Sequence, residues 1–176
     1  MDALTFFLAG TMQGRLRGGV IVDQGYRERI EGMIVHAFPS ATVICPYKAM
    51  VTAFGAKREM LLQDLQRIGT LPIASADAYP IGLQEVVAFF REMTRRAAAA
   101  DVLVAYLAAD EPSMGTAMEM WSAHAAGRIV ITITAARDSL AVLATSRFIV
   151  PDLDAFAHLL TPSGALTRQF PLADHP

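Results

Sequence analysis

The chain has 176 residues, 53% of them hydrophobic, so it is long enough and apolar enough to fill the core of one domain. Its formal net charge of −2, without a long basic run, argues against a protein built to bind a nucleic-acid polymer. The single cysteine, Cys45, cannot form a disulfide within the chain, and no apolar run approaches the ~20 residues that span a bilayer. The apolar run at residues 4–10 follows no basic leader, so we expect a cytoplasmic protein without membrane contact.

Five short apolar segments predict buried β-strands, at residues 4–9, 41–45, 102–107, 129–133 and 147–150. Helical periodicity predicts helices at residues 23–36, 57–68, 81–99, 116–126 and 152–160. Strands that are apolar on both faces and alternate with helices indicate a parallel sheet that is covered on both sides. The predicted fold is a small doubly wound α/β domain, flavodoxin-like or Rossmann-like, over residues 1–160, with a C-terminal tail at residues 161–176.

The first predicted helix has an apolar stripe formed by Ile30, Ile34 and Val35, and Arg27 is counted among its polar residues. In a doubly wound sheet, ligands bind beyond the carboxyl ends of the strands, where the strand order reverses. This rule puts the loops after residues 9 and 107 side by side.

The loop at residues 10–19 is rich in glycine and carries Arg15 and Arg17. Backbone amides freed by glycine, together with guanidinium groups, suit a phosphate. The glycine spacing matches neither the dinucleotide-binding fingerprint nor the P-loop. A strand-to-helix loop with solvated arginines is the alternative interpretation.

The loop after residue 107 carries Asp110 and Glu111 and leads to a helix with one carboxylate, Glu119, among apolar neighbours. Thr116 and Glu119 fit the spacing of a capping box, in which the threonine is the N-cap. The apolar surroundings instead place Glu119 within the protein or lining a cavity. The two roles are compatible, because a helix N-terminus favours the ionised carboxylate that a nucleophile requires.

The four histidines are scattered, and none pairs with an acid at metal-ligand spacing. They are His36, His124, His158 and His175. We therefore expect no metal and no cofactor. Without a serine nucleophile motif or a cysteine–histidine pair, carboxylate chemistry is the main catalytic option.

Three stretches of the chain resemble the nucleoside 2-deoxyribosyltransferase-like family, which includes the nucleoside 5′-monophosphate N-glycosidases. They are FFLAGT at residues 6–11, ADVLVA at residues 100–105, and SMGTAME at residues 113–119 with AHAAGRIV at 123–130. The resemblance implies that Glu119 is the nucleophile that attacks the anomeric carbon. An ionised carboxylate beneath that carbon stabilises an oxocarbenium-like state or traps it as a glycosyl-enzyme.

The resemblance also assigns substrate-binding positions. Gly10 and Thr11 shape the sugar site, and Gly115 and Thr116 belong to the matching motif. Ser113 resembles the monophosphate hydrolases, because a serine donates to phosphate where the transferases commonly have an aspartate. Arg15 and Arg17 suit the same phosphate. Phe7 stands where hydrolases can have tyrosine.

One position departs from the family pattern. Members usually place an aspartate eight residues before the aspartate of the ADVLVA strand, and this chain has Met93 there, with Glu92 beside it. Glu92 is therefore the second catalytic candidate, through a shifted register. The alternative is that this acid is missing, which would leave a nucleotide-binding domain with weak or altered activity.

The main hypothesis is an N-glycosidase acting on a nucleoside 5′-monophosphate through Glu119. The alternatives are a nucleoside 2-deoxyribosyltransferase that exchanges bases, and a non-catalytic nucleotide sensor. In each case the expected partner is a small nucleoside or nucleotide. Relatives in the family are typically dimers or larger, so we also expect a homodimer or higher homo-oligomer.

Overall fold

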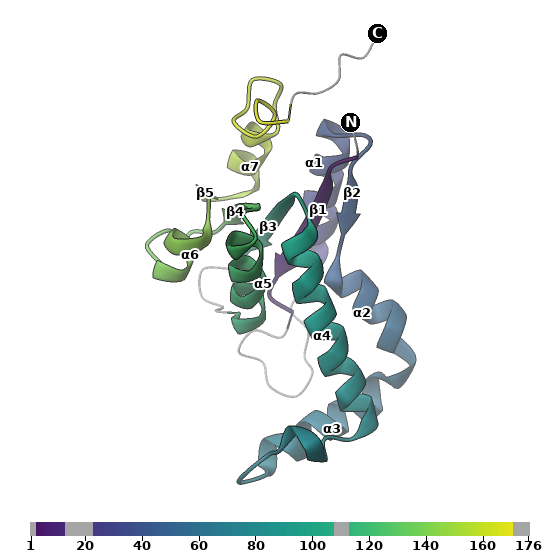
Figure 1. Ribbon diagram of the computed structural model, residues 1–176. Helices are drawn as coiled ribbons and strands as arrows, with labels where there is room; N and C mark the ends of the chain where they lie inside the picture. The colour runs from purple at the N-terminus through teal and green to yellow at the C-terminus, as the bar shows by residue number, and fades with distance from the viewer. Residues whose placement is uncertain (1–2, 13–22, 108–112, 171–176) are drawn as a thin grey trace.

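The computed structural model describes residues 3–12, 23–107 and 113–170 (Figure 1). Five strands form one sheet in the order β2-β1-β3-β4-β5, and every neighbouring pair is parallel. Their bounds are β1 Thr5–Gly10, β2 Thr42–Ile44, β3 Val102–Tyr106, β4 Ile129–Ile133 and β5 Phe148–Val150. All five strands were predicted from the sequence, each to within one residue at either end.

Helices cover both faces of the sheet, which confirms the predicted α/β class (Figure 1). Their bounds are α1 Gly25–Ala37, α2 Pro46–Phe54, α3 Arg58–Thr70, α4 Ile81–Ala99, α5 Met114–Ala125, α6 Leu140–Thr145 and α7 Leu153–Leu159. Two three-residue 3₁₀ helices, Gly55–Lys57 and Ala76–Ala78, complete the described elements. No described helix is long and apolar enough to cross a bilayer.

The alternation of side chains along β1 divides the core into two layers. Phe6 and Leu8 face α1 and α7, whereas Phe7 and Ala9 face α4 and α5. The side chains on both faces are fully buried, which explains why this strand is apolar at successive positions.

Two helices, α2 and α6, were not predicted. Pro46, which follows the predicted strand at residues 41–45, occupies the first turn of α2, where its missing N–H is not needed. Cys45, the N-cap residue of that helix, is a buried free thiol. Helix α6 has only six residues, too few for a reliable periodic pattern.

The predicted tail is in part a packed segment. Leu166 is fully buried in the layer that contains α1 and α7, and the hydroxyl of Thr167 donates to the backbone carbonyls of Thr161 and Gly164. The domain therefore continues beyond residue 160 to at least these residues.

Candidate active site

The candidate site lies at the carboxyl ends of β1 and β3, where the strand order reverses. Gly10 and Tyr106, the last residues of these strands, are direct neighbours in the sheet. The helix after β1 packs on one face of the sheet and the helix after β3 on the other. Residues from both layers can therefore meet over this edge, as the sequence predicted from the fold class.

Glu119 lies in α5 and is only 5% exposed. Ser113 is the N-cap residue of this helix, and its hydroxyl accepts a hydrogen bond from the amide of Thr116 at 3.2 Å. The predicted capping box, with Thr116 as the N-cap, is therefore wrong, because the helix begins earlier than expected. Glu119 lies in the second turn, too far along the helix to cap it.

Burial raises the pKa of the Glu119 carboxyl from its ordinary value of 4.5 to about 8, and the Arg27 guanidinium opposes part of this rise. No hydrogen bond joins the carboxyl group to another residue in the described part of the chain, and no fully buried side-chain oxygen there lacks a partner, so the carboxyl oxygens of Glu119 retain some exposure. The expectation that the helix N-terminus holds Glu119 ionised is thus corrected. At neutral pH the buried carboxyl of the free protein is mainly protonated.

Arg27 of α1 is 2% exposed, which corrects its assignment to the polar side of that helix. Its two terminal guanidinium nitrogens donate to the carbonyls of Leu8 and Gly10 at 2.7 and 2.8 Å, and Nε donates to Gln24 Oε1 at 2.6 Å. These three acceptors satisfy the charged group at a depth where an unpaired one would be costly. The side chain thereby fixes the end of β1.

Tyr26 and Tyr106 stack with their ring centroids 4.3 Å apart. The Tyr26 hydroxyl donates to the carbonyl of Thr11 at 3.4 Å, and burial raises its pKa to about 12. A Cβ atom at Gly10 would lie 2.3 Å from the Tyr26 hydroxyl oxygen. Glycine is therefore required at position 10 by packing, whatever its role toward a sugar.

Sequence reasoning missed Tyr26, Arg27 and Tyr106. A signal for Arg27 was available, because positions 27, 30 and 34 lie on one helical stripe at the spacing i, i+3, i+7. The charge of the arginine led to its assignment to the polar side. This stripe places Arg27 on the buried side of α1 together with Ile30 and Ile34.

The predicted substrate-binding residues of α5 form a structural cap. The Ser113 hydroxyl oxygen accepts from both the amide and the hydroxyl of Thr116, so its own proton remains available for a ligand. Thr116 is buried, and a Cβ at Gly115 would lie 3.3 Å from the Phe90 ring. Phe7 is fully buried in the core, with no surface for the ligand contact that was predicted.

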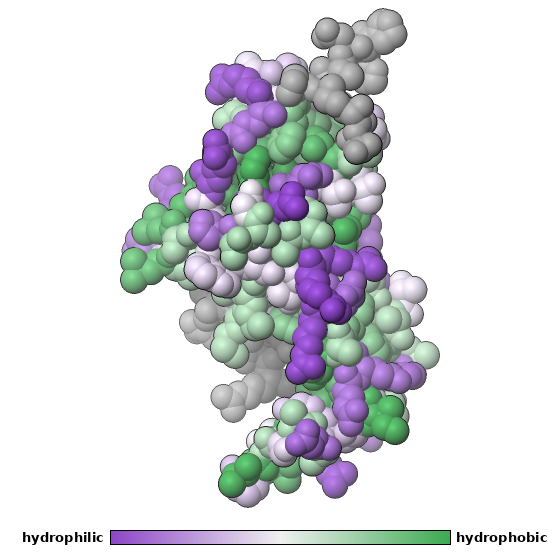
Figure 2. Space-filling model, in the orientation of Figure 1, coloured by the Kyte–Doolittle hydropathy of each residue, from purple (hydrophilic) through white to green (hydrophobic). Residues whose placement is uncertain are grey.

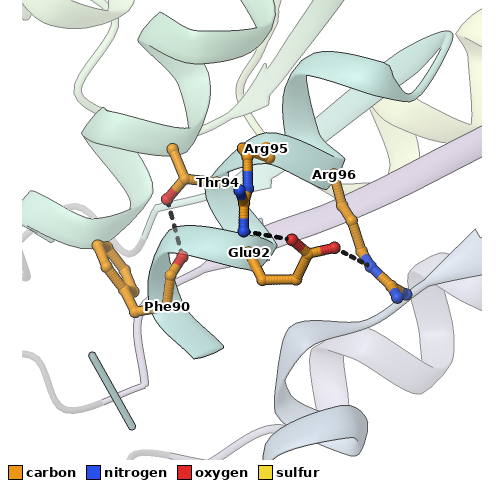
Figure 3. A network of polar contacts seen from close by, with 5 residues as sticks. All are labelled: Phe90, Glu92, Thr94, Arg95 and Arg96. Atoms are coloured by element: carbon orange, nitrogen blue, oxygen red, sulfur yellow. Dashed lines mark hydrogen bonds and ion pairs between the residues drawn. The ribbon is translucent and has the colours of Figure 1, made fainter. Parts of the chain in front are cut away.

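Glu92 lies on the outer side of α4, where its carboxylate pairs with Arg95 at 2.7 Å and Arg96 at 3.2 Å (Figure 3). Its neighbour Met93 packs into the core with α5. Because successive residues of a helix point about 100° apart, a buried Met93 turns Glu92 toward solvent. The shifted register is therefore not observed, and the structure does not bring Glu92 and Glu119 together.

Four predicted residues lie outside the described part of the chain: Arg15, Arg17, Asp110 and Glu111.

A cavity of about 360 Å³ opens at the same edge of the sheet, beyond β3, β4 and β5. Tyr106 lines it and also stacks on Tyr26, whereas Glu119 is not among its lining residues. The described residues include no group of three or more histidine, cysteine, aspartate or glutamate side chains suited to a metal.

The sequence matches no protein-family model and no curated protein. Among solved structures, the fold is similar to the 2-deoxyribosyltransferase from Bacillus psychrosaccharolyticus, with a TM-score of 0.55, 12% identity, and coverage of 87% of this chain and 90% of that chain. A 2-desoxiribosyltransferase from Leishmania mexicana matches with a TM-score of 0.49, 14% identity, and 89% and 97% coverage. At 12% identity, the first match shows that this chain and the Bacillus psychrosaccharolyticus protein share a fold.

Proposed function

We propose that the protein transfers a 2-deoxyribosyl group between nucleobases, with Glu119 as the nucleophile. The observation that carries the proposal is a buried carboxyl group at the point where the strand order reverses, without a hydrogen bond to another described residue. The carboxyl oxygens are not among fully buried atoms without a partner, so they keep the small exposure through which a nucleophile could meet a sugar. The fold shared with a 2-deoxyribosyltransferase favours base exchange over the hydrolysis that the sequence suggested first.

The chemistry uses two displacements at the anomeric carbon. A Glu119 carboxylate oxygen bonds to that carbon as the bond to the base breaks, and the electron pair of the broken bond goes to the base nitrogen, which takes up a proton. A second base then attacks the same carbon through a ring nitrogen, loses its proton, and releases the carboxylate. Water in place of the second base gives hydrolysis.

The test is base exchange by the purified full-length protein. A 2′-deoxynucleoside is mixed with a different free base, and the new nucleoside is quantified by chromatography. Acid-quenched protein should also carry a deoxyribosyl adduct on the peptide that contains Glu119. Glu119→Gln should remove both signals, and Glu92→Gln serves as the matched control because its carboxylate lies on the outer surface. Exchange that persists in Glu119→Gln would rule out the assigned nucleophile.

A second candidate function is hydrolysis of a nucleoside 5′-monophosphate. The observation that favours it is Ser113, whose hydroxyl can donate to phosphate without like-charge repulsion. Ser113→Asp separates the two candidates, because aspartate also caps a helix but repels phosphate. Loss of monophosphate cleavage with retained nucleoside exchange would support a phosphate contact, and Arg15→Ala and Arg17→Ala would then locate its cationic partner.

A nucleotide sensor predicts a different result in the same assays. A bound nucleotide would remain intact through prolonged incubation, and Glu119→Gln would change neither its stability nor the amount of free base. Base release by the unaltered protein would exclude this alternative.

We also propose that the chain self-associates through the outward side of α5. Met114, Met118 and Trp121 are exposed there at a helical spacing, Trp121 to 60%. Hydrophobic surface continues over the neighbouring α6, which carries the exposed Leu140 and Leu143 (Figure 2). Light scattering after size exclusion should show a dimer or larger species, and Met118→Lys should shift it toward the monomer.

A further inference from the structure

Two residues of α5, Gly115 and Ser122, show which side of this helix faces α4. A Cβ atom at Gly115 would lie 3.3 Å from the ring of Phe90, and the Ser122 hydroxyl donates to the carbonyl of Thr94 at 3.2 Å. Positions 115, 119 and 122 follow the spacing i, i+4, i+7, which places them on one side of a helix. Glu119 therefore lies between two residues that meet α4, and its side chain is directed toward the interface between the two helices.

The direction of the two helices places Phe90 on the open side of Glu119. Both run from the carboxyl edge of the sheet to its amino edge, since α4 leads into β3 and α5 leads into β4. The contact between Phe90 and Gly115 is thus one turn nearer to the carboxyl edge than Glu119. Helical side chains tilt toward the N-terminus of their helix, so Glu119 leans toward the Phe90 ring. Glycine at position 115 puts no side chain between them.

The side of α4 that meets α5 is largely apolar. Phe90, Met93 and Ala97 lie on it at the spacing i, i+3, i+7; the last two are buried, whereas Phe90 is half-buried and keeps part of its surface accessible. The Thr94 hydroxyl on the same side donates to the Phe90 carbonyl at 3.0 Å, so its proton is not available to a ligand (Figure 3). What this side offers a ligand is the aromatic ring of Phe90.

We propose that Phe90 is a substrate-contacting residue: its ring is the surface against which the nucleobase packs while Glu119 attacks the anomeric carbon. This inference rests on the proposed function and adds the group that holds the base. An aromatic ring stacks on the π-face of a base without reading its hydrogen-bonding groups. Recognition of this kind holds the base in place without selecting it by its polar edge.

The first experiment measures kcat and the KM for the acceptor base in the exchange assay. Phe90→Leu keeps an apolar contact with α5 but lacks the π-face, so the KM should rise about tenfold while kcat stays within about threefold. Phe90→Tyr returns the ring and should restore the KM. Phe54→Leu is the matched control, because it removes another half-buried ring, which packs on Phe89 with the centroids 5.4 Å apart. An unchanged KM in Phe90→Leu, or an equal rise in Phe54→Leu, overturns the proposal.

A further variant moves the ring without changing it. Gly115→Ala adds a methyl group 3.3 Å from the Phe90 ring, which must then shift by a few tenths of an ångström. The same methyl group stands between the ring and Glu119, so the KM for the base should rise here as well. A KM equal to that of the unaltered protein contradicts the assigned position of the base.

The second experiment measures binding without turnover. Adenine is titrated calorimetrically into Glu119→Gln and into the double variant that also carries Phe90→Leu. The Kd should be about tenfold higher in the double variant, and equal values overturn the proposal. If the unaltered protein exchanges no base, the proposed function fails, while the adenine titration still decides whether Phe90 contacts a base.

Discussion

Glu92 on α4 and Glu119 on α5 have pKa values that are shifted in opposite directions. Glu119 lies in the interior, and burial raises its pKa to about 8 although the charge of Arg27 opposes part of this rise. Glu92 lies on the outer side of α4 with two arginines, and its bonds to Arg96 and Arg95 lower its pKa. The difference shows that desolvation outweighs one buried cation, whereas at the surface the ion pairs prevail because water already solvates the carboxylate.

The comparison between Glu119 and Glu92 is tested most strongly by the base-exchange activity of variants that lack one or the other carboxylate. Glu119→Gln should lower base exchange by roughly 10³-fold or more, because the nucleophile is lost while the shape of the side chain is kept. Glu92→Gln should leave the rate within about twofold, as expected when a mutation lies away from the reacting atoms. A large loss in Glu92→Gln, measured in the same exchange assay, would reverse the assignment of the two carboxylates.

The pH dependence of the exchange rate sharpens the comparison further. A carboxyl with a pKa of about 8 is ionised to roughly one tenth at pH 7. The rate should therefore rise about tenfold per pH unit below pH 8 and level off above it. The measurement is the initial rate from pH 6 to pH 9.5. A rate already level at pH 6 would show that Glu119 is ionised in the working enzyme.

The raised pKa of Glu119 should also make the free energy of unfolding depend on pH. The folded protein retains the Glu119 proton up to about pH 8, whereas the unfolded chain releases it above 4.5. Stability therefore falls as pH rises through this window, by on the order of 5 kcal/mol in total, and is level above it. Urea unfolding at pH 5, 7 and 9 measures the slope, which should be flatter in Glu119→Gln. The lowered pKa of Glu92 has the opposite effect on stability. Its stabilising contribution is present at neutral pH and is lost as the pH falls into the acid range.

The effect of an added methyl group on stability should also differ between Gly10, which lies in the interior, and Gly32, which lies at the surface. Gly10→Ala places a methyl group against the Tyr26 hydroxyl and should destabilise the fold by about 1–3 kcal/mol. Gly32→Ala, on the same helix as Tyr26 with no atom within 4 Å of the added carbon, should instead stabilise it by roughly 0.5–1 kcal/mol. Equal effects of the two substitutions in thermal unfolding would contradict the close packing at the end of β1.

The smallest expected effect is the loss of the α5 cap. Ser113→Ala removes the acceptor for the Thr116 amide and should cost about 1 kcal/mol, and Ser113→Asp should restore most of it. Denaturant midpoints of the three proteins measure the difference. If alanine is tolerated without cost, the serine serves a ligand rather than the helix.

The fold was predictable because it follows from hydrophobic patterning over whole elements. Helix α4, with its wide apolar stripe, was predicted with the bounds that the structure shows. The site was less predictable, since it depends on single residues. Thr116 and Ser113 are both good N-caps, and the choice between them depends on where the preceding loop lets the helix begin. Arg27 was misassigned because a sequence does not show that the carbonyls at the end of β1 are its acceptors.

The exposed aromatic residue of α5 gives the protein a built-in optical reporter. Trp121 is the single tryptophan of the chain and lies two residues from Glu119 on the water-facing side of the same helix. Its fluorescence in the monomer should be that of an indole in water, and burial of this side chain against a second copy should move the emission to shorter wavelength. A dilution series read at one excitation wavelength therefore gives the association state of each variant without labelling.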